Sequence, residues 1–202
     1  MDHKNLKFNT KLIHAGEIDD QFGSATVPIY QTSTFKFKSA DHGAALFAGK
    51  EEGYIYTRIA NPTIRAFEQN IAALENGCDG IAVSSGMAAV TNVYFTFLSA
   101  GSHMISTASV YGPSRGVMEQ DFSKFGVDYT YLNTSNLDLI KKAIKPNTKL
   151  IYLETPSNPT MEVSDIVEIS KIAHEHGIMV AVDNTFATPY LQKPLDLVAD
   201  VV

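Results

Sequence analysis

The sequence predicts an α/β protein built on a mainly parallel sheet with helices on its faces. From about residue 80 onward, short apolar runs alternate with helix-length segments, which is typical of βαβ units. Polar residues follow several of these runs directly, as ligand-binding residues do at the carboxyl edge of open α/β sheets. The clearest case is the apolar run 178–182, which ends at Asp183.

Residues 1–60 show little of this alternation. A short amphipathic piece at residues 6–13 is followed by irregular sequence that includes Asp41-His42-Gly43. A segment of this kind usually packs on another body. We therefore expect an N-terminal arm over 1–60 that packs either on its own core or on a partner subunit, followed by an incomplete ligand-binding domain over 61–202.

Start and stop residues mark the elements of the second part. Asn61 caps a helix that has Pro62 at its first position and is closed by Gly77. The apolar run 80–83 predicts a strand, and a helix follows from Gly86 to about residue 98. The further elements expected are strands at 104–106, 127–132, 150–153 and 178–182, helices at 114–125, 136–144 and 164–176, and the start of another strand at 199–202.

Composition and charge exclude several functions. The 202 residues are 45% apolar and 19% charged, the profile of a soluble globular protein. A formal net charge of −6 argues against nucleic acid or an anionic membrane as a partner. Cys78 is the only cysteine, so no internal disulfide can form. The polar start at residues 1–5 is not a signal peptide, and we expect a cytoplasmic protein without a membrane span.

Two segments have the residue types of a phosphate site. Ser84-Ser85-Gly86-Met87 joins a predicted strand to a predicted helix, where backbone N–H groups and the helix dipole attract anions. Tyr56 and Arg58 offer a hydroxyl and a guanidinium to the same kind of anion. Taken alone, each segment is also explained without a ligand, as an N-capped turn and as a surface arginine. Neither of the glycine-rich motifs G-x-x-x-x-G-K-[ST] and G-x-G-x-x-G is present, which argues against a nucleoside triphosphate or a dinucleotide as the ligand.

Further candidates follow predicted strands at the same edge. Tyr111 comes after the strand at 104–106, where its ring could stack on a planar ligand or pack as a turn aromatic. Glu154 ends the strand at 150–153, and Asn158 follows in a loop with two prolines. Loops of this kind often have a functional role, although a purely structural turn is the alternative.

Asp183 is the most informative candidate. A carboxylate at the end of a buried strand is costly unless it has a partner. A protonated pyridine nitrogen is one such partner, as in pyridoxal-phosphate sites. The alternatives are a metal or a helix cap, but no ligand cluster accompanies Asp183. His174 and His176 point different ways on a helix, so no metal site is predicted.

Together and in this order, these segments resemble the transsulfuration family of pyridoxal-phosphate (PLP) enzymes. The family includes cystathionine γ-synthase, cystathionine lyases, O-acetylhomoserine sulfhydrylase and methionine γ-lyase. The resemblance covers essentially the whole chain. The motifs are Tyr56-Thr57-Arg58, Asn61-Pro62-Thr63, Ser84-Ser85-Gly86-Met87, Tyr111-Gly112, Glu154-Thr155-Pro156-Ser157-Asn158-Pro159 and Asp183-Asn184-Thr185-Phe186. The resemblance implies a fold-type I, aspartate aminotransferase-like architecture and pyridoxal 5′-phosphate as cofactor.

The resemblance also implies roles for individual residues. The implied cofactor-binding set is Tyr56, Arg58, Ser85, Gly86, Met87, Tyr111, Glu154, Asn158, Asp183 and Thr185. Tyr111 and Asp183 are the implied catalytic residues, with the tyrosine on the pyridine ring and the aspartate at its nitrogen. Tyr56 and Arg58 are implied to reach the phosphate bound in the neighbouring subunit. A dimer is therefore the expected active unit, and a homotetramer the expected assembly.

The family catalyses elimination or replacement at Cβ or Cγ of sulfur amino acids or O-acylhomoserines, in methionine or cysteine metabolism. Its Schiff-base lysine follows the aspartate further along the chain, so the sequence ending at Val202 is expected to be an N-terminal portion without it. Lys193 lies in a polar turn and is rejected as a substitute. We expect these residues alone to be inactive. One alternative is an incomplete paralogue that only dimerises or binds PLP weakly, and another is an unrelated α/β phosphosugar binder.

Two positions depart from the family pattern. Ala60 stands where glycine is usual before Asn61-Pro62, and this change is tolerable. Pro113 stands where methionine γ-lyases typically have a cysteine. The second departure weakens methionine γ-lyase as the specific activity without excluding it.

Overall fold

The structure is a computed structural model that describes residues 6–202, so the polar start at residues 1–5 lies outside the described part. The chain divides into two compact units, one ending at Ala82 and the other running from Val83 to Val202. The two units are described separately below. The predicted arm over 1–60 concerns contact with a neighbouring subunit, and it stays a prediction.

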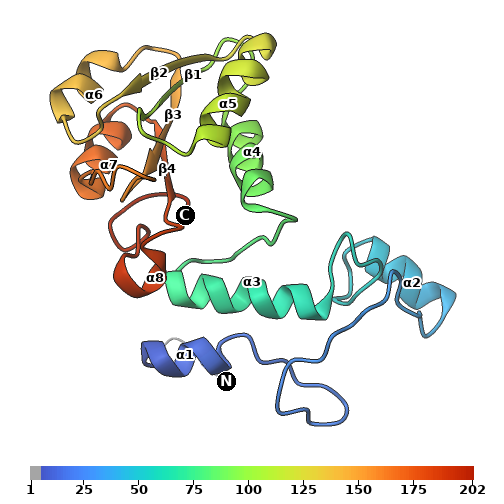
Figure 1. The fold of residues 1–202 in the computed structure, drawn as a ribbon. Coiled ribbons are helices and arrows are strands. Elements are labelled where there is room, and N and C mark those ends of the chain that lie inside the picture. The colour runs from blue at the N-terminus through green and yellow to red at the C-terminus, as the bar shows by residue number, and fades with distance from the viewer. Residues whose placement is uncertain (1–5) are drawn as a thin grey trace. The chain divides into compact units, whose positions relative to one another are not determined.

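The first unit contains α1 (Phe8–His14), α2 (Ala40–Phe47) and α3 (Pro62–Glu75) (Figure 1). Helix α2 corrects the sequence analysis, which interpreted Asp41-His42-Gly43 as irregular. The Ser39 hydroxyl caps this helix by accepting the N–H of His42. Gly43 allows close packing, because a Cβ at this position would lie 2.7 Å from the Phe37 ring. A helix this short has too few apolar positions to show a period.

Helix α3 starts as the sequence predicts. Asn61 Oδ1 accepts the N–H of Thr63 at 2.9 Å, and Pro62 occupies the first helical position. Its end differs from the prediction by one residue, because Asn76 rather than Gly77 takes the left-handed conformation, with φ of 57°. Asparagine adopts this conformation more readily than most residues other than glycine.

The second unit is built on a four-stranded sheet in the order β2-β1-β3-β4. Its strands are β1 (His103–Thr107), β2 (Asp128–Leu132), β3 (Thr148–Glu154) and β4 (Met179–Asp183). All pairings are parallel, so the carboxyl ends of the strands lie at one edge. These strands confirm the predicted α/β class. Val201 forms a single parallel bridge with Ala181 where the sequence predicts another strand to start.

Helices cover both faces of this sheet (Figure 1). The elements after Val83 are α4 (Gly86–Phe97), α5 (Gly112–Gln120), the 3-10 turn Phe122–Phe125, α6 (Leu137–Ala143), α7 (Ile166–Glu175) and α8 (Thr188–Leu191). Side chains of β3 alternate between the faces: Ile151 and Leu153 pack with α6 and α7, whereas Leu150 and Tyr152 pack with α4 and α5. None of the helices in residues 6–202 is long and apolar enough to cross a membrane.

The predicted strand at 80–83 is wrong. This segment is irregular, and Ile81 is 87% exposed. The segment is instead attached to Glu68, whose carboxylate accepts the N–H of Ala82 at 2.9 Å. An apolar run becomes a strand only where a neighbouring strand pairs with its backbone groups. No strand in residues 6–202 pairs with this segment.

Candidate functional site

The ends of β3 and β4 place two carboxylates side by side. Glu154 and Asp183 are register partners at the last paired position of the two strands. Register partners project from the same face of a sheet, and Tyr152 shares that face because it lies two residues before Glu154. Tyr152 packs with α4 and α5, so all three side chains lie on the face that these helices cover.

The Glu154 carboxylate is bound by the backbone of two loops. Oε2 accepts the N–H of Tyr111 at 2.6 Å, and Oε1 accepts the N–H of Asn158 at 2.7 Å. Burial raises the pKa of Glu154, although the two N–H groups act in the opposite direction. The structure therefore brings three predicted site residues together, with Glu154 between the other two.

Asp183 is held by neutral donors. The Tyr152 hydroxyl donates to Oδ2 at 3.2 Å, and the hydroxyl and N–H of Thr185 donate to Oδ1 at 2.6 and 3.2 Å. Within residues 6–202, no basic side chain lies within 4.0 Å of this half-buried carboxylate. A half-buried carboxylate that is bound only by neutral donors can pair with a cationic group of a ligand, such as a protonated pyridine nitrogen.

Tyr152 is a site residue that the sequence analysis missed. Its buried ring meets the ring of Tyr94 edge to face, with 5.3 Å between the centroids, and its hydroxyl reaches Asp183. Burial raises the pKa of Tyr152 well above its ordinary value, so the hydroxyl keeps its proton and stays a donor. The signal for its position was the alternation along the predicted strand, which places Tyr152 on the same face as Glu154.

The start of α4 has two backbone N–H groups, of Gly86 and Met87, with no acceptor in residues 6–202. The Ser85 hydroxyl accepts the N–H of Ala88, and the Ser85 carbonyl accepts the N–H of Ala89, both at 3.1 Å. The φ of Gly86 is not left-handed, and a Cβ there would meet nothing within 4 Å. Neither conformation nor packing therefore requires glycine here, and the open backbone suits a bound anion.

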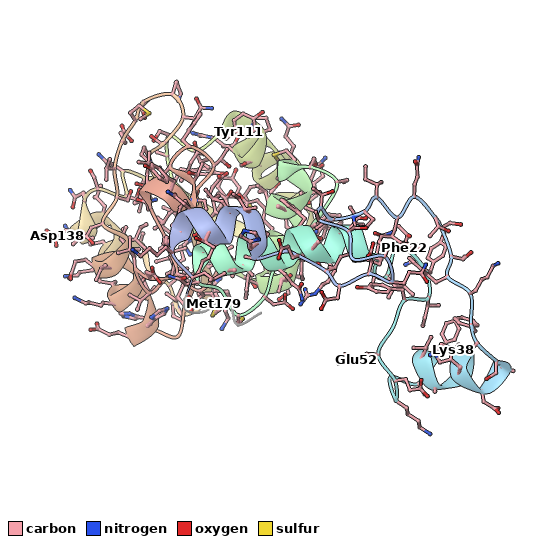
Figure 2. The ribbon with its side chains drawn as sticks, turned by 90° about the horizontal axis from the view of Figure 1, so that it is seen from below. Phe22, Lys38, Glu52, Tyr111, Asp138 and Met179 are labelled. Carbon is pink, nitrogen blue, oxygen red and sulfur yellow. The ribbon has the colours of Figure 1, made fainter. Side chains whose placement is uncertain are left out.

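The start of α5 lies beside the start of α4. Ser114 Oγ lies 3.8 Å from Met87 Sδ. Tyr111 is the residue before the first turn of α5 and is 44% exposed (Figure 2). Through the bond from Tyr111 to Glu154 and the pairing of Glu154 with Asp183, a chain of contacts joins the start of α4 to the end of β4.

Tyr56 and Arg58 lie in the first unit, next to each other. The guanidinium carbon of Arg58 is 5.5 Å from the centroid of the Tyr56 ring. Arg58 is exposed and, within residues 6–202, has no carboxylate within 4.0 Å, whereas Arg65 pairs with Glu68 and Asp79 and Arg115 pairs with one carboxylate. Its charge is therefore available to an anion.

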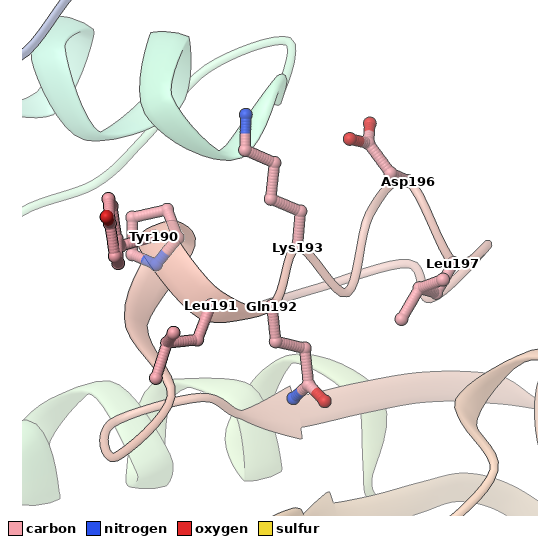
Figure 3. Close-up of a pocket in the computed structure, with 7 residues that line it drawn as sticks. Tyr190, Leu191, Gln192, Lys193, Asp196 and Leu197 are labelled. Atoms are coloured by element: carbon pink, nitrogen blue, oxygen red, sulfur yellow. The ribbon is translucent and has the colours of Figure 1, made fainter. Parts of the chain in front are cut away.

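An open hollow of about 450 Å³ lies beside α8, lined by residues between Pro189 and Leu197 (Figure 3). Gln192 turns toward the sheet, where its amide donates to the Thr155 carbonyl at 2.7 Å, and Lys193 points the opposite way (Figure 3). That Lys193 is not the catalytic lysine stays a prediction. In the described part of the chain, no group of three or more His, Cys, Asp or Glu side chains could hold a metal ion.

A parallel α/β sheet with an open helix start and a carboxylate at its carboxyl edge is an arrangement that suits an anionic ligand with a basic nitrogen. The family described as Cys/Met metabolism PLP-dependent enzyme matches residues 9–202. The chain therefore belongs to this family, as the resemblance predicted.

Individual relatives agree with this assignment. The chain is 50% identical over 201 residues to the L-methionine gamma-lyase of Treponema denticola, a match that covers 98% of this chain and 50% of that protein. The crystal structure of metB from Corynebacterium glutamicum matches with a TM-score of 0.93 and 41% identity, covering 100% of this chain and 51% of that one. A putative O-acetylhomoserine (thiol)-lyase from Campylobacter jejuni, solved with N′-pyridoxyl-lysine-5′-monophosphate, matches with a TM-score of 0.92 and 35% identity, covering 98% and 48%.

These matches confirm the predicted fold-type I architecture of the transsulfuration enzymes. The chain spans about half the length of the relatives it matches.

Proposed function

We propose that the full-length protein containing these residues uses PLP to catalyse elimination or replacement at Cβ or Cγ of a sulfur amino acid or an O-acylhomoserine. One observation supports this most strongly. A single face of the sheet presents, at its carboxyl edge, a helix start with two open N–H groups, of Gly86 and Met87, and the Asp183 carboxylate, which has no cationic partner in residues 6–202.

The residues at this edge fit PLP. The N–H groups of Gly86 and Met87 and the hydroxyl of Ser85 suit a phosphate, and the exposed ring of Tyr111 suits stacking on a planar ligand. Asp183 suits the protonated nitrogen of a pyridine. Bound PLP supplies an electron sink for the negative charge that develops at the substrate Cα.

Each side chain then has a distinct task. Asp183 keeps a proton on the ring nitrogen, because a neighbouring carboxylate favours the charged form of that nitrogen. Tyr152 and Thr185 orient Asp183 without neutralising it. Tyr111 covers one face of the ring, and its hydroxyl can hold or move a proton near the substrate. The side-chain amide of Asn158 is proposed to contact the ring hydroxyl.

Tyr56 and Arg58 are proposed to bind the phosphate held by a neighbouring subunit. The available charge of Arg58 supports this role, because a guanidinium binds phosphate with two parallel hydrogen bonds. We accordingly propose a dimer as the active unit and a tetramer as the assembly.

The experiment uses the full-length protein with and without added PLP. It measures release of a 2-oxo acid from L-methionine, L-cystathionine and L-cysteine, and replacement of the acyloxy group at Cγ of an O-acylhomoserine by a thiol, with release of the free carboxylic acid. We expect PLP-dependent turnover of at least one substrate. Turnover that does not need PLP, or no change in the visible spectrum on adding PLP, would contradict the proposal. PLP binding without turnover would favour the incomplete paralogue.

The same assay decides between methionine and other substrates. The identity to the L-methionine gamma-lyase of Treponema denticola favours methionine, whereas Pro113 argues against it, since methionine γ-lyases typically have a cysteine there. The ratio of kcat/KM for methionine to kcat/KM for cystathionine measures the preference directly.

A further inference from the structure

One buried carboxylate connects two loops that contribute to the proposed site. The loop at 108–111 follows β1 and ends at Tyr111, and the loop at 155–163 follows β3 and contains Asn158. Glu154, which is 4% exposed, reaches the first loop with Oε2 at 2.6 Å and the second with Oε1 at 2.7 Å. The two loops come from different strands, and Glu154 lies between them.

The two hydrogen bonds to Glu154 are strong, and each loop contributes one of them. The distances lie just below and at the short end of the usual range for N–H···O bonds, and bonds to an ionised acceptor are stronger than bonds to a neutral one. Each oxygen of Glu154 accepts one backbone N–H. No side chain in residues 6–202 donates to this carboxylate, so the two loops alone satisfy it.

The arrangement fixes the backbone and leaves the side chains available. The Tyr111 ring stays partly exposed, and the side-chain amide of Asn158 has no hydrogen-bond partner in the described residues. Both oxygens of Glu154 point at protein N–H groups, so neither is directed at a ligand. Resting on the proposed function, we infer that Glu154 is a positioning residue that sets Tyr111 and Asn158 against the cofactor through their backbone N–H groups and does not contact the cofactor itself.

The inference explains why a carboxylate occupies this position despite its burial. A carboxylate accepts from two N–H groups at once, whereas the amide of glutamine has one accepting oxygen and an NH₂ group that cannot accept. In Glu154→Gln, therefore, only one loop keeps its hydrogen bond. The backbone N–H of the other loop then faces the NH₂ group of the glutamine, which is also a donor. Glu154→Asp keeps the charge, but its side chain is shorter by one methylene and reaches one loop at a time.

A second contact between the same loops offers a matched control. Ser109 donates its hydroxyl hydrogen to Glu162 at 2.7 Å. This contact is exposed and involves neither backbone N–H group that Glu154 binds. Ser109→Ala therefore removes a connection between the loops without releasing Tyr111 or Asn158.

The experiment compares the full-length protein with its Glu154→Gln, Glu154→Asp and Ser109→Ala variants. It measures the Kd for PLP by titrating the apoprotein, the visible circular dichroism per bound PLP, and the Tm of the apoprotein. We expect Glu154→Gln to weaken PLP binding by about 10-fold or more and to lower the dichroism per bound PLP, with a modest fall in the apoprotein Tm because one buried N–H loses its acceptor. Glu154→Asp should give an intermediate result, and Ser109→Ala should match the wild type.

Two results would overturn the inference. One is wild-type affinity and dichroism in both Glu154 variants. The other is a fall in Tm and affinity with unchanged dichroism per bound PLP, which indicates a merely structural role. If Glu154→Gln fails to fold, Glu154→Asp decides by the same readouts. In all these cases the proposed function stands as long as the wild type binds PLP and turns over a substrate; a wild type that does neither refutes the proposed function instead.

Discussion

Glu154 and Asp183 are register partners at the ends of β3 and β4, yet their carboxylates have different kinds of partner. Glu154 is buried and accepts two backbone N–H groups, whereas Asp183 is half-buried and accepts from the side chains of Tyr152 and Thr185. Both oxygens of the Glu154 carboxylate accept hydrogen bonds from the protein backbone. The Asp183 carboxylate can still pair with a cation brought by a ligand.

Gly86→Ala should affect binding without harming the fold. Its φ is not left-handed and a Cβ has open space, so the apoprotein should be as stable as the wild type or gain up to about 1 kcal/mol. The added methyl group lies where the phosphate is proposed to approach, so the Kd for PLP should rise by about 10-fold or more. Urea unfolding and PLP titration measure the two effects.

Gly177→Ala is the control for this variant. Gly177 has φ of +65° and lies at the end of α7, away from the start of α4. Alanine there should lower the free energy of unfolding by about 1 kcal/mol and leave the Kd for PLP unchanged. Wild-type PLP affinity in Gly86→Ala would contradict the proposed phosphate site.

Asp183→Asn should lower kcat by about 100-fold or more while PLP remains bound, because an amide no longer stabilises the charged ring nitrogen. Turnover of the preferred substrate and the PLP content of the purified protein measure the two properties. Asp138→Asn is the control, since Asp138 is an exposed residue in the first turn of α6. Equal activities of the two variants would argue against the pairing of Asp183 with the cofactor.

Tyr152→Phe should have a smaller effect than Asp183→Asn. It removes one of the three hydrogen bonds to Asp183 and retains the ring that packs on Tyr94, so kcat should fall by about 10-fold or less. The control is Tyr131→Phe, whose hydroxyl donates to the Arg115 carbonyl instead. Steady-state kinetics of both variants test this, and a Tyr152→Phe enzyme as fast as the Tyr131→Phe enzyme would not agree with an orienting role.

His103 makes the stability of the second unit depend on pH. It lies buried between the hydroxyls of Thr148 and Thr130, and burial lowers its pKa to about 4, with Lys145 acting in the same direction and Asp128 against it. The folded state therefore favours neutral His103, whereas the unfolded chain takes up a proton near the ordinary pKa of 6.5. The contribution of neutral His103 to folding stability is fully present above pH 6.5 and is lost as the pH falls toward 4. We expect His103 to account for a loss of about 2 kcal/mol between pH 7 and pH 5.

Urea unfolding of the apoprotein at pH 7 and pH 5 measures this loss. His103→Gln cannot titrate, so its stability should change less between the two pH values than that of the wild type. The same change in both proteins would mean that other groups cause the pH dependence.

Much of the second unit could be predicted because its signals are local. Strands β3 and β4 contain the apolar runs at 150–153 and 179–182, each followed by an acidic residue. In the first unit, likewise, α3 starts at Asn61 and Pro62, where the sequence predicts it. The segment 80–83 has the same local signal but no strand partner in the described residues, so the run remains irregular. Strand formation depends on a neighbour, which a single sequence does not reveal.

The candidate site likewise has residues that local sequence could predict and contacts that it could not. Residue type and position at a strand end were enough to select Asp183, Tyr111 and Asn158. The bond from Tyr152 to Asp183 and the bonds from two loops to Glu154 depend on strand register and on the path of the backbone. The register of parallel strands is set by packing between elements that are distant in sequence, and no short motif encodes it.

The most direct measurement is a crystal structure of the full-length protein with PLP. The account predicts a phosphate oxygen within about 3.2 Å of the N–H groups of Gly86 and Met87, and an Asp183 oxygen at a similar distance from the pyridine nitrogen. A phosphate bound away from the start of α4, or a pyridine nitrogen without Asp183 beside it, would contradict the proposed site.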